Sequence, residues 1–135
     1  MALKFSVAVR NARLDAIETA IGASAVLKIR TGAAPANITD ADSGTVLATL
    51  ALPADWMAAA SSGSKAMAGT WSDAAADAAG TAAHFRIYAT DGVTIHAQGS
   101  VTATGGGGDM TLDNVSIAAG QTINITGFTL TDGNA

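Results

Sequence analysis

The segment from residue 82 to residue 101 constrains the fold more than any other part of the chain. Two runs of alternating apolar and polar residues are joined there at Thr90-Asp91-Gly92. This pattern is typical of a β-hairpin with one buried face. A three-residue loop with Gly92 in the left-handed region brings the apolar side chains of the two runs together. That register pairs Ala89 with Val93, Ile87 with Ile95 and Phe85 with Ala97.

The same register gathers the polar side chains of the hairpin on its other face. It places Tyr88 opposite Thr94, Arg86 opposite His96 and His84 opposite Gln98. One apolar and one polar face predict a half-exposed antiparallel sheet. His84, Arg86, Tyr88 and His96 are therefore candidate interface residues on the solvent side.

Length and residue usage limit the class of protein. A chain of 135 residues predicts a single domain with a core of its own. The absence of Cys excludes disulfides, thiolate metal sites and cysteine catalysis. The N-terminus lacks the apolar run of a signal peptide, and no segment has the roughly 20 apolar residues that span a bilayer. We therefore expect synthesis in a cytoplasm and no membrane partner.

The charge of the chain argues against a nucleic-acid partner. Its net charge is −4 with only seven Lys and Arg, whereas nucleic-acid binding needs clustered basic residues. Charged residues make up 13%, against about a quarter in ordinary soluble domains, and the mean hydropathy is +0.33. Two interpretations remain open: an Ala- and Gly-rich globular domain, or a protein that packs against copies of itself or a lattice.

The N-terminal part, residues 1–22, is predicted to be an arm and an amphipathic helix. Val7, Leu14, Ile17 and Ile21 recur at helical spacing, while the polar residues fall elsewhere on the helix. Those polar residues are Arg10, Asn11, Asp15 and Glu18. Ser6 can cap the start, and Gly22 is placed to end the helix.

Residues 23–135 read as β structure. Leu27 and Ile29 are predicted to point inward and Lys28 and Arg30 outward, and residues 45–52 read as a strand buried on both sides. Further strands are expected at residues 66–71, 110–117 and 121–131, the last with a β-bulge at Gly127. About seven short strands favour a mainly β fold, an antiparallel β-sandwich or jelly-roll-like domain.

The sequence contains few candidates for chemistry. The run Gly105–Gly108 precedes a strand and lacks the Lys-Ser/Thr pair of a phosphate loop, so we interpret it as a flexible connection. His84 and His96 share a face, but no third zinc ligand is placed beside them. Asp73 and Asp77 are interpreted as charges at a helix start, and no Gly-x-Ser-x-Gly motif is present. We therefore predict no enzymatic activity, metal, cofactor or small-molecule substrate.

Trp56 and Trp71 are the two largest apolar side chains of the chain. Such residues are more often part of a core, and the alternative is that they anchor an interface. They complete the set of candidate interface residues.

Four segments resemble small structural proteins of tailed bacteriophages. They are Met1-Ala2-Leu3-Lys4-Phe5-Ser6 continuing into Arg10-Asn11-Ala12-Arg13-Leu14-Asp15-Ala16-Ile17, then Leu27-Lys28-Ile29-Arg30-Thr31-Gly32-Ala33-Ala34-Pro35, then Gly80-Thr81-Ala82-Ala83-His84-Phe85-Arg86-Ile87-Tyr88, and Gly127-Phe128-Thr129-Leu130-Thr131-Asp132-Gly133. The resemblance covers nearly the whole chain, but its motifs are architectural and carry no functional site.

The resemblance implies a virion protein on the surface of a phage head. The specific expectation is a homo-oligomeric decoration (cement) protein that binds the major capsid lattice and stabilises it. The alternative is a tail-tip or fibre adhesin, which requires exposed aromatic residues for stacking on glycans. A small hydrolase is a third possibility, but no assembled site supports it.

Overall fold

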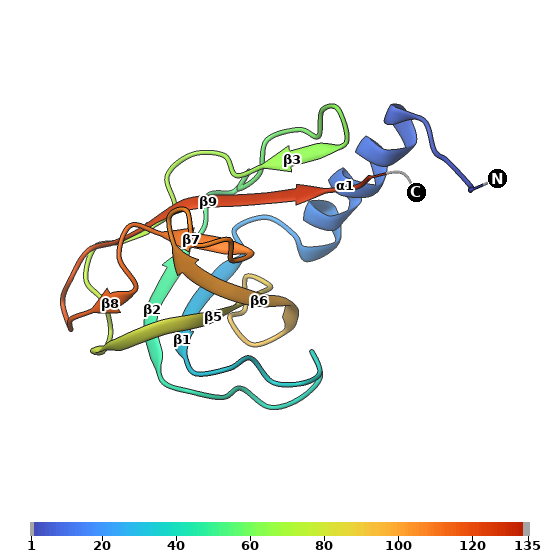
Figure 1. Cartoon of the computed structure of the whole chain (residues 1–135). Helices are drawn as coiled ribbons and strands as arrows, with labels where there is room; N and C mark the ends of the chain where they lie inside the picture. The colour runs from blue at the N-terminus through green and yellow to red at the C-terminus, as the bar shows by residue number, and fades with distance from the viewer. Residues whose placement is uncertain (1, 134–135) are drawn as a thin grey trace.

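The computed structural model describes residues 2–133, as one helix followed by nine strands (Figure 1). The helix α1 spans Val7–Ile21. The strands are β1 (Val26–Thr31), β2 (Val46–Ala51), β3 (Ser64–Ala66), β4 (Ser72–Asp73), β5 (Gly80–Tyr88), β6 (Ile95–Ala103), β7 (Met110–Leu112), β8 (Ser116–Ile117) and β9 (Ile123–Thr131).

The strands follow one hydrogen-bonded path in the order β2-β1-β5-β6-β7-β9-β3. Strand β4 pairs with β9 and β8 pairs with β5, and every pair is antiparallel except β6 with β7. The sheet curls around the core, and the β9–β3 ribbon extends from it toward α1 (Figure 1). The prediction of a mainly β fold with an N-terminal helix is confirmed. The sandwich or jelly-roll arrangement is not, because the strands form a single curled path.

The ends of α1 agree with the prediction. The Ser6 side chain accepts a hydrogen bond from the Val9 amide, and the Gly22 amide donates to the Glu18 carbonyl at a φ of 98°. The buried face differs from the prediction. Leu14 and Ile21 are buried, but Val7 and Ile17 are 46% and 40% exposed.

The hairpin of β5 and β6 has the predicted left-handed Gly92, with a φ of 68°, but a different register. Ile87 pairs with Ala97 and not with Ile95, and Tyr88 pairs with Ile95, so that His96 is an extra residue in a bulge. Val93, predicted to be inward, is 75% exposed. The predicted register was therefore wrong by two residues.

Asp91 stabilises the loop that closes this hairpin. Its carboxylate accepts hydrogen bonds from the amides of Val93 and Thr94 and from the Thr94 hydroxyl. The Thr94 hydroxyl, followed by the two amides, lowers the pKa of Asp91 to about 2. The longer loop accounts for the shifted register, because it uses residues that the prediction assigned to strand pairs.

The centre of the core is a row of four aromatic rings. Trp56 lies 5.9 Å from Trp71, Trp71 lies 5.6 Å from Phe128, and Phe128 lies 5.6 Å edge-on from Phe85, between ring centroids. Such tilted contacts are favourable beyond the apolar area that they bury. A bulge in β9 is confirmed, one residue from the predicted position: Thr111 pairs with Gly127 and Leu112 with Ile125, so the extra residue is Thr126 and not Gly127.

Strands β1 and β2 follow the predicted alternation only in part. Leu27 and Ile29 are buried as expected, but Arg30 is buried as well. In β2 the side chains of Thr49 and Ala51 are exposed, so that strand is not buried on both sides. No helix begins at Asp73 or Asp77, contrary to the prediction. Both carboxylates accept hydrogen bonds from Thr49, through its amide and its hydroxyl respectively.

The glycine run 105–108 forms a tight return between the parallel strands β6 and β7. A Cβ on Gly106 would lie 3.0 Å from the Ala103 carbonyl oxygen, and one on Gly108 would lie 2.9 Å from the Thr102 nitrogen. Gly105 and Gly107 have φ values of 86° and 81°. Backbone geometry therefore requires glycine at these positions, a constraint that the interpretation as a flexible connection did not include.

Candidate functional site

The polar face of the hairpin is covered by residues 32–45, which connect β1 to β2. Asp42 of this connection binds two arginines of the sheet: its carboxylate lies 2.8 Å from Arg30 Nη2 and 2.9 Å from Arg86 Nη1. The Tyr88 hydroxyl donates to the same carboxylate at 2.8 Å. We call Asp42, Arg30, Arg86 and Tyr88 the Asp42 cluster.

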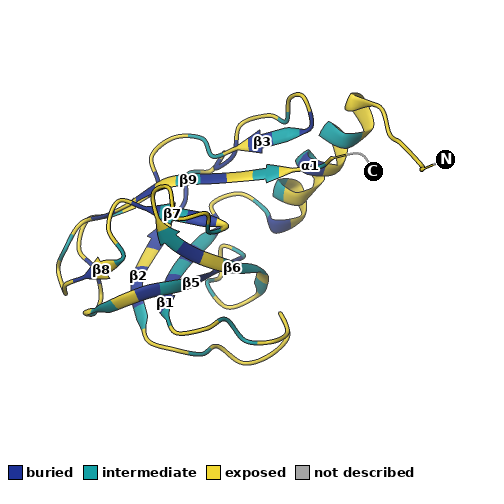
Figure 2. Ribbon diagram, in the orientation of Figure 1, coloured by how far each residue is buried: buried dark blue, intermediate teal, exposed yellow. Residues whose placement is uncertain are grey.

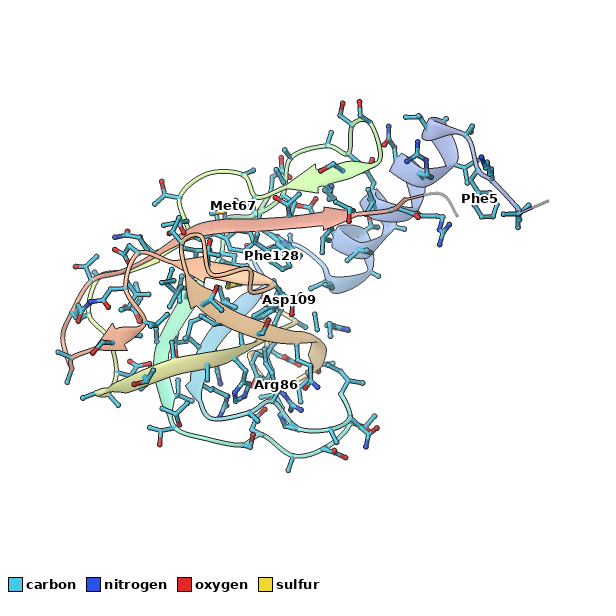
Figure 3. The ribbon with its side chains drawn as sticks, in the orientation of Figure 1. Phe5, Met67, Arg86, Asp109 and Phe128 are labelled. Atoms are coloured by element: carbon cyan, nitrogen blue, oxygen red, sulfur yellow. The ribbon has the colours of Figure 1, made fainter. Side chains whose placement is uncertain are left out.

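Backbone carbonyls attach the rest of the connection to the sheet. Arg86 donates to the Asp40 carbonyl at 3.0 Å, and the Gln98 amide group donates to the Pro35 carbonyl at 2.8 Å. His84 Nδ1 lies 2.7 Å from the Gly32 carbonyl oxygen. Figure 3 shows Arg86 on the side of the sheet that faces this connection. The prediction that the polar face is exposed to solvent was wrong.

The surroundings of Asp42 favour the ionised form of its carboxyl group. Partial burial by itself raises the pKa of Asp42, but hydrogen bonds from Tyr88 and Arg86 and the two arginine charges lower it overall. Burial, and then the hydrogen bond to Asp42, raise the pKa of Tyr88. Arg86 is fully buried, so the cluster neutralises a charge that would be costly to leave unpaired.

A second cluster joins α1 to the strand β3. The Lys65 ammonium is 2% exposed and lies 2.7 Å from Asp15 and 2.9 Å from Glu18. The Asp15 carboxylate also accepts a hydrogen bond from the Ala60 amide, and the Glu18 carboxylate accepts one from the Met57 amide. Asp15 and Glu18, which the prediction placed outside the apolar stripe of the helix, therefore attach α1 to the rest of the protein.

A shallow groove lies on the other side of α1. It encloses about 350 Å³ and is lined by Arg13, Leu14, Ile17, Thr131 and Asp132. The guanidinium of Arg13 pairs with Asp132 at 3.1 Å, and Arg10 donates to the Asp132 carbonyl. The groove is open to solvent at the exposed Ile17 side chain.

Five of the six candidate interface residues are inside the protein. Trp56 and Trp71 are in the aromatic row of the core, and His84, Arg86 and Tyr88 are buried under residues 32–45. Only His96 is exposed. The structure therefore contradicts these five as surface residues, because a rigid body offers a partner only its exposed side chains.

The two histidines do not form a pair. His84 lies opposite Ser100, whereas His96 is in the bulge near the hairpin loop. Residues 2–133 contain no group of three His, Cys, Asp or Glu side chains arranged to hold a metal ion.

Sequence reasoning missed the groove and both ionic clusters. The one available signal was the alternation of Lys28, Arg30, His84 and Arg86 with apolar residues, which indicates a face outside the apolar core. That signal does not show whether water or another segment covers the face.

No membrane-spanning helix is found among residues 2–133. Comparison of the chain with known protein families, with curated proteins and with solved structures finds no match.

Proposed function

We propose that the protein is a non-enzymatic structural component of a tailed-bacteriophage virion that decorates the outer face of the capsid. The resemblance of the four segments quoted above motivates this assignment. The structural observation that carries it is the use of charged side chains to hold peripheral segments on the sheet. Asp42 holds residues 32–45, and Lys65 holds α1.

This use of charge suits a protein that bears mechanical load. A connection of about a dozen residues is ordinarily mobile. Here the Asp42 cluster and three carbonyl contacts attach it at several points along its length. A body stiffened in this way transmits force between lattice neighbours without local unfolding.

The distribution of aromatic residues favours decoration over the adhesin alternative. The chain has six Phe, Trp and Tyr residues, and five of them are buried. Phe5, in the N-terminal arm, is the exception at 40% exposed. Figure 3 shows Phe5 at the far end of the molecule from Phe128. An adhesin that stacks on glycans needs aromatic rings grouped on an exposed loop.

The test is binding to purified phage heads that lack decoration. The protein is incubated with these heads in low salt and in molar salt, and bound copies are counted by gel densitometry. An apolar interface with neutral edges retains most of its binding in molar salt. Binding to host cells or envelope glycans with none to heads would transfer the protein to the adhesin class.

A further inference from the structure

The connection of residues 32–45 covers the Asp42 cluster without an apolar anchor of its own. None of its residues is buried, and Figure 2 shows it in yellow and teal, the colours of exposed and half-exposed residues. Ile38, its largest apolar side chain, is 38% exposed. Among residues 2–133, Asp42 is the only residue of the connection whose side chain binds the sheet through hydrogen bonds and ion pairs. The cover therefore depends on polar contacts that an ion can replace.

Arg30, beneath this cover, lacks acceptors for several of its hydrogen-bond donors. The residue is 6% exposed, and its one short contact is from Nη2 to the Asp42 carboxylate at 2.8 Å. Its Nη1 reaches the carbonyl oxygens of Ser43 and Gly44 only at 3.4 and 3.5 Å, and its Nε has no partner. A buried donor of a charged group is costly to leave unpaired. Asp42 therefore satisfies Arg30 only in part.

The charge of the cluster is also incompletely balanced. Two guanidinium groups, those of Arg30 and Arg86, are buried around the carboxylate of Asp42. No other carboxylate in the described part of the chain pairs with either arginine, so one positive charge remains in excess. His84 lies opposite Arg30 across β1 and β5, and its buried Nε2 has no partner either. Both unpartnered nitrogens thus lie on neighbouring strands beneath the same cover.

We propose that Arg30, Arg86 and Tyr88 form a binding site for a phosphate group, which Asp42 fills when no phosphate is bound. Asp42 divides its two carboxylate oxygens between the two arginines, and this arrangement leaves the Nε of Arg30 unbound. Nε and Nη2 lie on the same edge of a guanidinium group and bind two oxygens of one phosphate. A phosphate also carries close to two negative charges at pH 7, which match the two arginines.

An ion reaches this site through Asp42. The side chain of Asp42 is 36% exposed, whereas Arg86 and Tyr88 are buried. When Asp42 turns outward to water, phosphate takes the donors that it vacates. The carbonyl oxygens of Gly32 and Pro35 keep their own contacts with the sheet, at 2.7 and 2.8 Å. Phosphate is therefore expected to loosen the connection around Asp42 without detaching all of it.

This inference goes beyond the capsid role and does not depend on it, because the free protein is sufficient for the test. Asp42→Ala vacates the site. The matched control is Asp40→Ala in the same connection, whose side chain bonds only to Asn37 among the described residues. The parent protein and both variants are titrated with inorganic phosphate by calorimetry, at an ionic strength held constant with chloride.

Asp42→Ala is expected to bind one phosphate about tenfold more tightly than the parent protein or Asp40→Ala. The reason is that a site filled by Asp42 for about nine-tenths of the time is available to an added ion for only the remainder. Equal affinities in the three proteins would overturn the proposal. Asp42→Asn, which removes the charge and keeps the shape, replaces Asp42→Ala if that variant does not fold.

Magnetic resonance spectra of the arginine Nε–H groups locate the bound ion and require no variant. Phosphate is expected to shift the Nε–H signal of Arg30 in the parent protein, and to do so at lower concentration in Asp42→Ala. Arg10 is the control, because its Nε is also buried without a partner but belongs to α1. An Arg30 signal that moves no more than that of Arg10 would rule out the site.

Two further measurements define the ligand. Tyr88→Phe removes one donor without a change of charge, so it is expected to weaken phosphate binding several-fold in the Asp42→Ala background. An unchanged affinity would contradict the assigned site. Glycerol phosphate, a small phosphate ester, distinguishes the source of the phosphate group. Binding of both compounds shows that the site accepts the phosphate of a larger molecule, and binding of inorganic phosphate alone assigns the site to the free ion. Binding of neither overturns the proposal.

Discussion

The ring of Phe85 on β5 lies directly over Gly99 on β6. A Cβ placed on Gly99 would come within 2.8 Å of Cε1 and 2.9 Å of Cζ of that ring. Phe85 is 2% exposed and contacts Phe128 edge-on, so the ring has little room to move. The absence of a side chain at Gly99 therefore fixes how closely β6 approaches the aromatic row.

Gly99→Ala is expected to lower the free energy of unfolding by about 1–3 kcal/mol, the usual cost of overpacking a core. In a Phe85→Leu background the same change costs at least about 1 kcal/mol less, because contacting residues are energetically coupled. Denaturant unfolding of the two single variants and the double variant measures this coupling. Additive effects would mean that the ring does not limit the approach of β6.

The glycine run between β6 and β7 gives a graded series. Gly108→Ala is expected to cost about 2 kcal/mol, since its Cβ meets the backbone of Thr102. Gly107→Ala has open space around it, but its positive φ costs about 1 kcal/mol. Gly133→Ala, with neither constraint, is the control and is expected to change nothing. Thermal unfolding of the three variants checks the order. If all three variants are neutral, the glycine run is better described as a flexible connection.

The attachment of α1 is expected to depend on pH. A hydrogen bond from Lys65, and then one from the Ala60 amide, lower the pKa of Asp15. Burial by itself lowers the pKa of Lys65, but Asp15 and Glu18 raise it overall. The contribution of Asp15 is therefore complete above about pH 4 and lost as pH falls through its folded value. That of Lys65 is complete below about pH 10 and lost as pH rises through its folded value.

Tryptophan fluorescence reports this attachment, because Trp56 donates to the carbonyl of Gly22 at the end of α1. We expect an acid transition below pH 4 that Asp15→Asn moves or removes. Asp55→Asn, which lies outside the ion pairs of Lys65 with Asp15 and Glu18, is the control. A transition that is identical in all three proteins would show that Asp15 does not govern it.

Local features of the fold could be predicted from neighbouring residues. Ser6 caps the start of α1 and Gly22 its end, each through a hydrogen bond within one helical turn. Leu27 and Ile29 are buried as the alternation of apolar and polar residues predicts. The bulge in β9 follows from the change of phase between Ile125 and Phe128, because both must reach the same core.

The hairpin register could not be predicted in the same way. The predicted pairing of Ile87 with Ile95 and the observed pairing with Ala97 differ by two residues, so both place apolar side chains on one face. The choice depends on the hydrogen bonds of Asp91 within the loop and on the pairing of β5 with β1. The second of these is a long-range contact that alternation within the hairpin does not encode.

The burial of the candidate interface residues could not be predicted for a similar reason. Alternation shows that Arg86 and Tyr88 face away from the apolar core, but the segment that covers them is some forty residues earlier in the chain. Only the folded arrangement brings Asp42 over them. The polar face of the hairpin is therefore covered by this segment and is not a surface that a partner can reach.

The Asp42 cluster leads to the final prediction. Asp42→Asn keeps the shape of the side chain but removes the only negative charge that pairs with Arg30 and Arg86 among the described residues. Both guanidinium groups are nearly inaccessible to water, so the change leaves buried positive charge without compensation. Breaking a buried pair in this way typically costs about 3–5 kcal/mol, and the lower figure applies because the Asp42 carboxylate is 36% exposed.

The matched control is Asp40→Asn, in the same connection. Among residues 2–133, the exposed Asp40 side chain bonds only to Asn37. Its contact with Arg86 is made by the backbone carbonyl, which the substitution retains. We expect Asp40→Asn to remain within about 1 kcal/mol of the parent protein. Chemical denaturation gives both values, and amide exchange of residues 32–45 shows whether the connection has detached. If both substitutions cost the same and the connection stays protected, then Asp42 does not hold it, and the rigid body inferred for capsid binding loses its main support.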